Sequence, residues 1–239
     1  MQNRVAFPHS NRLRTPIFIG YDPREAVNFH VCVNSILRHA REPVSIIPLY
    51  LPQLPYRESH GDGSNQFIYS RFLVPYLCGF NGWALYMDSD MIVKSDVCEL
   101  FDLKNDWCDA MVVKHEYKTK HHSKYLGAKN EDYPRKNWSS LILWNCASYP
   151  NRILTSDFVA KQSGKFLHRF EWISDGRLGE LGRQWNWLVG EYPHNAEAKI
   201  LHYTLGSPAF SEYANCDHST EWNAALAKMM HCEQLMEVA

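Results

Sequence analysis

The sequence predicts a single α/β domain with a mostly parallel central sheet flanked by helices. The length of 239 residues suits one hydrophobic core. Hydrophobic residues make up 45% of the chain and charged residues 21%, which is ordinary for a globular protein. Short apolar runs alternate with segments of helical pattern, and this alternation favours parallel strands joined by crossover helices.

Each expected element has a local signal. Residues 15–20 form a short apolar run that closes on a glycine, as a buried strand does. Residues 26–39 carry apolar side chains at the spacing of one helix face. A second helix is expected over residues 69–77, in which Pro75 marks a kink or an early end. Further strands are expected over residues 45–49, 83–87, 110–113 and 139–144, and a loop over residues 51–66.

One long loop and two terminal segments complete the predicted domain. Residues 114–136 are polar and rich in Lys, Arg and His, and they form either a solvated surface loop or a binding loop or lid. Residues 1–14 are a polar N-terminal segment without the apolar stretch of a secretory signal. Residues 211–239 are a C-terminal tail whose helical part, from residue 219, packs on the domain or mediates dimerisation or membrane contact.

Polar residues follow several of the predicted strands. In open α/β sheets, ligands bind at the carboxyl ends of the strands, near a switch in strand order. This rule selects a small set of positions for close reading. They are Tyr21, Asp22, Asp88, Ser89, Asp90, Asn145 and His202.

The sequence Asp88-Ser89-Asp90 is the most informative motif. An apolar strand delivers two carboxylates that are separated by one residue. Residues two apart in an extended chain point the same way, so both carboxylates can reach one ion. Hard oxygen ligands suit Mg²⁺ or Mn²⁺, and two close carboxylates without a cation would repel each other. We therefore expect Asp88 and Asp90 to hold a divalent metal.

A second motif lies at residues 200–208. A short apolar strand ends in His202 and is followed by Gly206, Ser207 and Pro208 in a tight loop. Neutral imidazole is a good ligand for Mn²⁺ as well as Zn²⁺. The backbone at Gly206 and Ser207 can approach a diphosphate closely, because glycine has no Cβ to clash.

Together these motifs resemble the GT-A (Rossmann-like) glycosyltransferases, and most of all glycosyltransferase family 8 and its bacterial and viral relatives. The resemblance rests on the strand at residues 17–21, the Asp88-Ser89-Asp90 motif and the segment 202–208, and it covers roughly residues 16–210. It implies a metal-dependent transferase that moves a hexose from a nucleotide-diphosphate sugar to an acceptor. Mn²⁺ or Mg²⁺ would be the metal and UDP-glucose or UDP-galactose the donor, with retention of anomeric configuration.

The resemblance also implies roles for single residues. Asp88 would contact the donor and share the metal, Asp90 would be the main metal ligand, and His202 would complete the coordination. The remaining donor-binding positions would be Gly20, Tyr21, Asp22, Arg71, Ser89, Gly206 and Ser207.

Two further residues are expected at the transferred sugar by the same resemblance. Asn145 would lie near the donor sugar. Asp175 would lie next to the sugar being transferred, where it would stabilise the oxocarbenium-like centre or orient the acceptor. The chain departs from the family pattern in three places: Gly206 comes one residue late after His202, no Lys precedes Pro208, and Gly176 stands where a Gln is usual.

Two other functions remain open from the sequence. Aspartyl-phosphate phosphotransferases also place Asp-x-Asp after a buried strand, with the first Asp as nucleophile. Their motif usually opens the chain, whereas two strand–helix units precede Asp88 here. The second alternative is a non-catalytic nucleotide or carbohydrate binder on a transferase scaffold, which the missing Lys and Gln would fit.

Composition restricts the partners and the compartment. A net charge of −1 offers no field that would recruit nucleic acid, and the apolar runs are too short to span a membrane. The seven cysteines are odd in number and lack the spacing of zinc or redox motifs, which favours reduced thiols in a cytoplasmic protein. The expected partners are the nucleotide-sugar donor and a glycan or other hydroxyl acceptor, with a homodimer left open.

Overall fold

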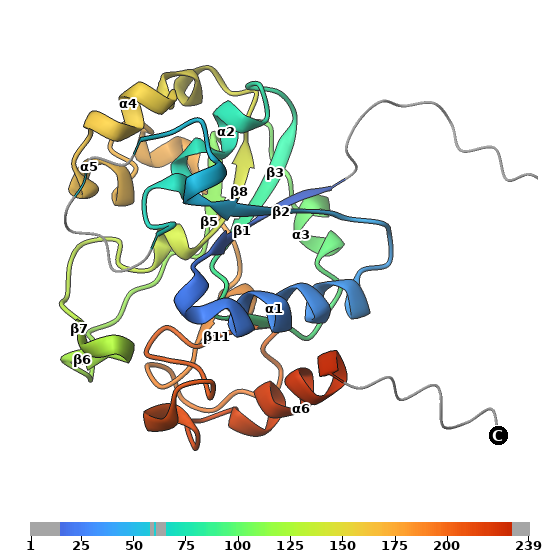
Figure 1. The fold of residues 1–239 in the computed structure, drawn as a ribbon. Coiled ribbons are helices and arrows are strands. Elements are labelled where there is room, and N and C mark those ends of the chain that lie inside the picture. Colours follow the sequence, from blue (N-terminus) through green and yellow to red (C-terminus); the bar gives the residue numbers. More distant parts are fainter. Residues whose placement is uncertain (1–14, 58–59, 61–65, 231–239) are drawn as a thin grey trace, which may run out of the picture.

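The computed structural model describes residues 15–57, 60 and 66–230, and it shows helices on both faces of a central sheet (Figure 1). The six-stranded sheet has the order β2-β1-β3-β8-β5-β9, and every strand except β8 runs in the same direction. The predicted mostly parallel sheet flanked by helices is therefore confirmed. The strands are β1 (Pro16–Tyr21), β2 (Ser45–Tyr50), β3 (Trp83–Met87), β5 (Ala110–Val112), β8 (Leu141–Asn145) and β9 (Leu178–Glu180).

The two faces of the sheet are covered by different helices. Successive strand residues point to opposite faces, so Ile17 and Leu85 pack with α1 and α3, whereas Phe18 and Tyr86 pack with α2, α4 and α5. Strands buried on both faces read as nearly continuous apolar runs, which explains why the sequence marks them so clearly. The helices are α1 (Ala26–His39), α2 (Val74–Leu77), α3 (Cys98–Asp102), α4 (Ser156–Lys161), α5 (Gly164–His168) and α6 (Ser219–Met230).

A smaller sheet adjoins the carboxyl end of β3. Its order is β10-β11-β4, made of β10 (Trp187–Leu188), β11 (Ile200–His202) and β4 (Met91–Val93). Beneath it, α6 lies beside α1 in Figure 1, and Trp222 of α6 packs with Val31 of α1 and Tyr203 in a third apolar cluster. The C-terminal helix thus packs on the domain; residues 231–239 of the predicted tail and residues 1–14 lie outside the described residues.

Two predicted elements differ from the structure. Residues 69–77 are a 3₁₀ turn (Ser70–Leu73) followed by the short α2, because Pro75 has no N–H to continue an α-helical ladder. The strand expected over residues 139–144 begins at Leu141, after a 3₁₀ turn (Trp138–Ser140).

The polar segment 114–136 holds a small hairpin of β6 (Ser123–Lys124) and β7 (Ala128–Lys129).

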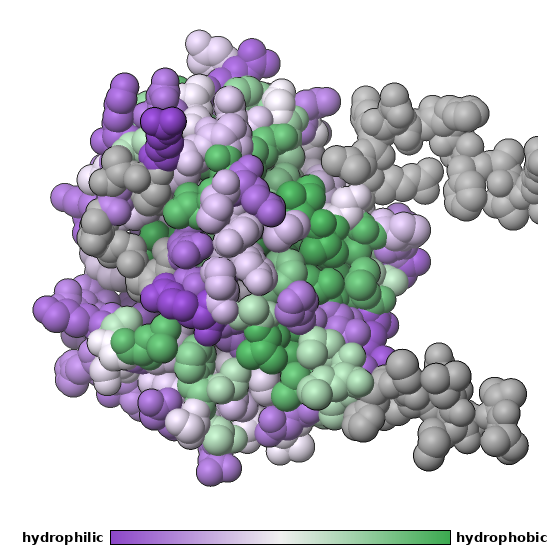
Figure 2. Space-filling view, viewed as in Figure 1, coloured by the Kyte–Doolittle hydropathy of each residue, from purple (hydrophilic) through white to green (hydrophobic). Residues whose placement is uncertain are grey.

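The face seen in Figure 2 mixes hydrophilic and hydrophobic side chains, with hydrophobic ones gathered most densely toward the right of the view. Among the described helices, none combines the length and the apolar composition needed to cross a bilayer.

Candidate metal and donor site

The structure brings together the side chains of Asp88, Asp90 and His202. One ligand atom from each lies within 4.8 Å of the other two. Asp88 follows the last residue of β3, and the chain then turns at Ser89 into β4. Because β4 pairs antiparallel with β11, Met91 lies opposite His202, and the Tyr203 N–H donates to the Asp90 carbonyl at 2.9 Å. Two strands distant in sequence therefore fix the histidine beside the carboxylates.

Asp90 is buried and Asp88 is partly buried, and one oxygen of Asp90 has no hydrogen-bond partner among the described residues. Asp90 is 9% exposed, and its Oδ1 accepts no hydrogen bond from a described residue although His202 Nε2 lies 3.3 Å away. Burial raises the pKa of Asp88, and the neighbouring Asp90 raises it further, while Arg71 opposes the shift. Burial acts to raise the pKa of Asp90 as well, but His202 outweighs it and the pKa is lowered. An unsatisfied buried oxygen beside a second acid is an environment that favours a cation.

Asn186 orients His202. The Asn186 Oδ1 lies 2.9 Å from His202 Nδ1, and Asn186 Nδ2 donates to Ser140 Oγ at 2.8 Å. An amide oxygen can only accept, so Nδ1 carries a proton; when the ring is neutral, Nε2 is therefore the nitrogen with the lone pair, 3.3 Å from Asp90 Oδ1. Ser140 Oγ in turn donates to the Asn137 carbonyl, and the Ser140 carbonyl accepts from the Asp88 N–H. One network thus holds two of the three candidate ligands.

We expect Asn186→Leu to weaken Mn²⁺ binding by about 10–100-fold, the usual cost of losing the partner of a metal-bound histidine. The leucine leaves His202 Nδ1 without an acceptor and frees the ring to rotate. Calorimetric titration of the metal-free protein with Mn²⁺ measures the change. Asn186→Asp keeps the acceptor oxygen and should retain most of the affinity. Equal losses in the two variants would contradict the orienting role.

Arg71 meets Asp88 from the other side. Its Nη1 lies 3.0 Å from Asp88 Oδ1 and donates to the Ser139 carbonyl at 2.8 Å. The same Asp88 oxygen accepts from the Tyr86 hydroxyl at 2.5 Å. The buried guanidinium also lies 5.0 Å from the centre of the Tyr86 ring. Arg71 therefore balances the negative charge at the site, in the position where the sequence placed a donor-binding residue.

The predicted residues at the end of β1 adjoin the site but have structural partners. A Cβ on Gly20 would lie 2.3 Å from the Phe67 ring, so glycine is required for this close packing. The Asp22 carboxylate is held by the Arg24 side chain and by the backbone N–H groups of Arg24 and Gln66. Tyr21 packs edge-on against two aromatic rings, those of Phe29 and Tyr50.

The loop after β11 is tied to α1. Gly206 has a φ of +152°, and a Cβ there would lie 2.3 Å from the Tyr213 ring. Ser207 is buried and donates through Oγ to Asn28 Oδ1 at 2.7 Å. Asn28 reaches a further acid, Glu25, whose pKa burial raises to about 8, with Asp90 and Asp22 adding to the shift. The Ser207 hydroxyl thus serves the fold, and no pattern in the sequence marks the buried Glu25.

Asn145 does not lie at the site. It is the last residue of β8 and pairs in register with Trp83, the first residue of β3, whereas Asp88 follows the last. Because β8 runs antiparallel to β3, the carboxyl end of β8 lies beside the amino end of β3, away from Asp88. The Asn145 Nδ2 donates to the Cys108 carbonyl at 3.0 Å in that region. The structure thus places Asn145 away from the carboxylate pair, contrary to its expected place near the donor sugar.

Asp175 lies at the same end of the sheet as Asn145, opposite the end that carries Asp88. It opens the 3₁₀ turn that directly precedes β9, and the Arg177 carbonyl of this turn accepts from the N–H of Asp109, which precedes β5. The Asp175 side chain is 83% exposed and forms an ion pair with Arg135. The structure therefore does not bring Asp175 to the carboxylate pair, contrary to its expected place beside the transferred sugar.

A cavity of about 70 Å³ opens beside the three candidate ligands. The polar segment 114–136 contributes Lys124, Tyr125 and Tyr133 to its wall, and α5 contributes His168. Burial lowers the pKa of His168 to about 3, with Arg71 and Lys124 adding to the shift, so this ring is neutral at pH 7. These residues come from segments without a recognisable motif, and for that reason sequence reasoning missed them. Ser89, also predicted here, is buried and its Oγ has no partner among the described residues.

Comparison with solved structures identifies the fold. WbbM, a bifunctional glycosyltransferase, matches with a TM-score of 0.60 and 17% identity over 93% of this chain and 51% of that one. GlyE of Streptococcus pneumoniae matches with a TM-score of 0.59 and 16% identity over 90% of this chain and 60% of that one. The chain thus spans about half to three fifths of these two proteins. The galactosyltransferase LgtC, solved with donor and acceptor sugar analogues, matches with a TM-score of 0.53 and 10% identity over 92% of this chain and 98% of that one. The fold is GT-A glycosyltransferase-like.

Comparison by sequence gives a nearer relative. No protein-family model matches the chain. The Arabidopsis thaliana protein named Protein CDI is 39% identical over 216 residues, which cover 86% of this chain and 83% of the relative. At this identity and coverage, the chain belongs to the same family as Arabidopsis Protein CDI.

Proposed function

We propose that this protein is a metal-dependent glycosyltransferase that uses a nucleotide-diphosphate sugar. The observation that supports it most is the convergence of Asp88, Asp90 and His202 at one end of β3. The residues fit a divalent cation, because a carboxylate oxygen of Asp90 lacks a hydrogen-bond partner in the described part of the chain and a neutral His202 presents a lone pair at Nε2. A Mn²⁺ or Mg²⁺ ion held there would stabilise the developing charge of the leaving diphosphate.

The chain's own cations extend this site. Lys124 lines the cavity and lies close enough to Asp90 to affect its pKa: burial acts to raise this pKa, but His202 and then Lys124 lower it. It supplies positive charge for the diphosphate, in place of the Lys that does not precede Pro208. The segment 114–136 is then a binding loop. Nucleotide sugars need a pocket several times larger than the present cavity, so this segment moves when the donor enters.

The position of Asp88 favours a transferase over an aspartyl-phosphate enzyme. Two strand–helix units precede Asp88, whereas the aspartyl-phosphate motif usually opens the chain, and Arg71 and Tyr86 engage Asp88 Oδ1 and leave Oδ2 for a metal ion. The hexose, the retention of configuration and a hydroxyl acceptor follow from the family 8 resemblance, with UDP as the nucleotide.

We expect Lys124→Met to weaken Mn²⁺-dependent UDP binding by about 10-fold, because one charge-assisted contact to the diphosphate is lost. Calorimetry in the presence of Mn²⁺ measures the effect. Lys129→Met is the matched control, since Lys129 belongs to the same hairpin and is exposed outside the cavity. Equal affinities for UDP in the two variants would remove Lys124 from the donor site.

The function itself is tested by a screen of nucleotide sugars for hydrolysis that depends on Mn²⁺. The expected result is turnover of UDP-glucose or UDP-galactose that stops when EDTA is added. Binding of UDP without hydrolysis or transfer would instead identify a non-catalytic binder. Phosphate release from simple phosphomonoesters, with a covalent phosphate trapped on Asp88, would overturn the proposal in favour of a phosphotransferase.

A further inference from the structure

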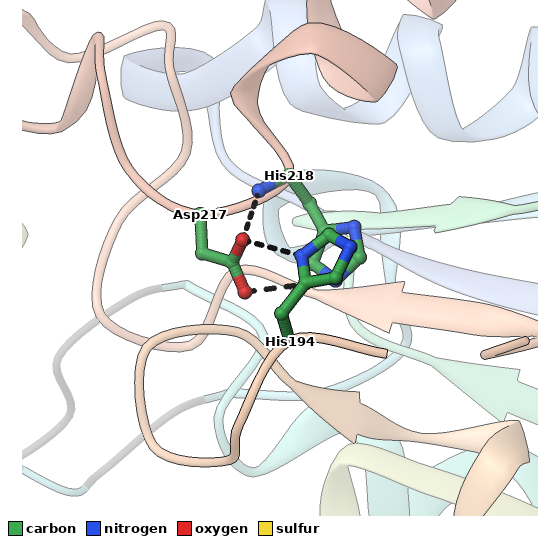
Figure 3. A group of neighbouring side chains, drawn as sticks. All are labelled: His194, Asp217 and His218. Carbon is green, nitrogen blue, oxygen red and sulfur yellow. Dashed lines mark hydrogen bonds and ion pairs between the residues drawn. The ribbon is translucent and has the colours of Figure 1, made fainter. Parts of the chain in front are cut away.

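A second cluster of side chains that could bind a metal shares no residue with the donor site. His194, Asp217 and His218 each offer one ligand atom within 4.8 Å of the other two (Figure 3). His194 lies in the turn before β11, whereas Asp217 and His218 directly precede α6. The Asp217 carboxylate contacts both imidazoles from one side: Oδ1 is 2.7 Å from His194 Nδ1, and Oδ2 is 3.6 Å from His218 Nε2.

His218 is held in place before any ion binds. Its side chain is fully buried, its Nδ1 lies 2.7 Å from Glu221 Oε1, and its carbonyl accepts from the Tyr203 hydroxyl at 2.8 Å. A carboxylate partner requires a proton on Nδ1, so Nε2 is the acceptor nitrogen; it lies 3.6 Å from Asp217 Oδ2 and accepts from the Asn195 N–H at 3.4 Å. A carboxylate followed by a histidine is the arrangement that supports metal-bound histidines, and an ion at Nε2 would take the place of the long contact from Asn195.

The backbone at His218 has a conformation that is unusual for a residue other than glycine. Its φ of +56° is in the left-handed region, which a non-glycine residue seldom adopts. His218 directly precedes α6, and its carbonyl accepts from the Trp222 N–H of that helix at 3.2 Å. The nearby carboxylates of Asp217 and Glu221 counter the positive end of the helix dipole, which would otherwise disfavour a cation there.

We propose that His194, Asp217 and His218 form a binding site for a divalent transition metal, with Zn²⁺ the best match. Two imidazoles and one carboxylate are a ligand set that Zn²⁺ takes at about 2.0–2.2 Å, with water in the fourth position. The ion ties the turn before β11 to the start of α6, whose Trp222 packs into the apolar cluster with α1. Its effect is on the stability of this C-terminal part, separate from the donor site.

One movement completes the site. The two rings are stacked, with centroids 4.2 Å apart and planes 13° from parallel. A bound metal lies in the plane of each imidazole, so stacked rings cannot both point at one ion. The His194 side chain is 61% exposed and can turn, whereas His218 stays fixed. His218 is thus the anchor of the site and His194 the ligand that closes on the ion.

The test is a titration of the full-length, metal-free protein with Co²⁺, followed by its visible absorption, and with Zn²⁺, followed by thermal unfolding. Asp90→Asn, which disables the donor site, should still bind one Co²⁺. Zn²⁺ at a hundred-fold excess over its dissociation constant should raise the unfolding temperature of that variant by about 5–10 °C. Adding His194→Ala or Asp217→Asn to Asp90→Asn should weaken this remaining site at least 10-fold.

His30→Ala is the matched control, because His30 is an exposed histidine of α1 outside the cluster. It should leave the Co²⁺ spectrum and the Zn²⁺-dependent shift unchanged. His218→Gln removes the anchor and should abolish binding, but if this buried change prevents folding, the exposed His194→Ala decides. The proposal is overturned if Asp90→Asn binds no Co²⁺, or if its Zn²⁺-dependent shift survives both His194→Ala and Asp217→Asn.

Discussion

Replacing Asp90 by Asn is expected to abolish Mn²⁺-dependent UDP binding and to lower transferase turnover by at least about 10³-fold. The carboxylate is buried, lies 3.3 Å from His202 and has an oxygen to which none of the described residues donates a hydrogen bond. An amide keeps the size of the side chain but loses the charge on which a divalent cation depends. Loss of the cation removes several kcal/mol of charge stabilisation from the leaving diphosphate. Calorimetry with UDP and Mn²⁺, and a transfer or hydrolysis assay, measure the two effects.

Two matched Asp→Asn changes control for the loss of one negative charge. Asp157→Asn alters an exposed acid of α4 and should change neither binding nor turnover. Asp175→Asn tests the difference between sequence and structure directly, since the sequence placed this residue beside the transferred sugar and the structure places it at the opposite edge of the sheet. We expect Asp175→Asn to keep full activity. A loss as large as that of Asp90→Asn would restore the sequence-based assignment.

The elements that the sequence predicted well are those with purely local signals. The runs at β1, β3 and α1 are long and apolar enough to be read without knowledge of their neighbours. The pair Asp88 and Asp90 was found for the same reason, because its meaning depends only on the strand that it follows. The approach of His202 was expected from motif resemblance, and the structure supplies the cause, which is the pairing of β11 with β4.

Strand direction was the main thing that the sequence could not provide. The apolar pattern of β8 is the same whether the strand runs parallel or antiparallel. Asn145 at its end was therefore expected beside the residues that follow the parallel strands. β4 is only three residues long and follows the Asp pair directly, which left it invisible as a strand. Lys124, in the two-residue strand β6, reaches the site through tertiary contacts, and no local pattern marks such a residue in one sequence.

Replacing Arg71 by Met is expected to destabilise the metal-free protein by about 3–5 kcal/mol, because it leaves a buried carboxylate without its partner. Arg71 is the cation that faces Asp88 at 3.0 Å, and burial already raises the pKa of that acid. Urea unfolding followed by tryptophan fluorescence measures the change. Arg71→Lys is the control: it keeps the charge but not the planar fork that spans Asp88 and the Ser139 carbonyl, so the loss should be smaller.

The same variant links stability to the proposed metal. A divalent cation at Asp88 and Asp90 supplies the positive charge that Arg71→Met removes, so Mn²⁺ should stabilise this variant more than it stabilises the unaltered protein. Arg71→Met combined with Asp90→Asn should lose that extra stabilisation, because the ion then has no site. If Mn²⁺ instead shifts the unfolding midpoints of the unaltered protein and of Arg71→Met equally, the ion does not act on Asp88. The guanidinium and the metal would then be independent features of this end of the sheet.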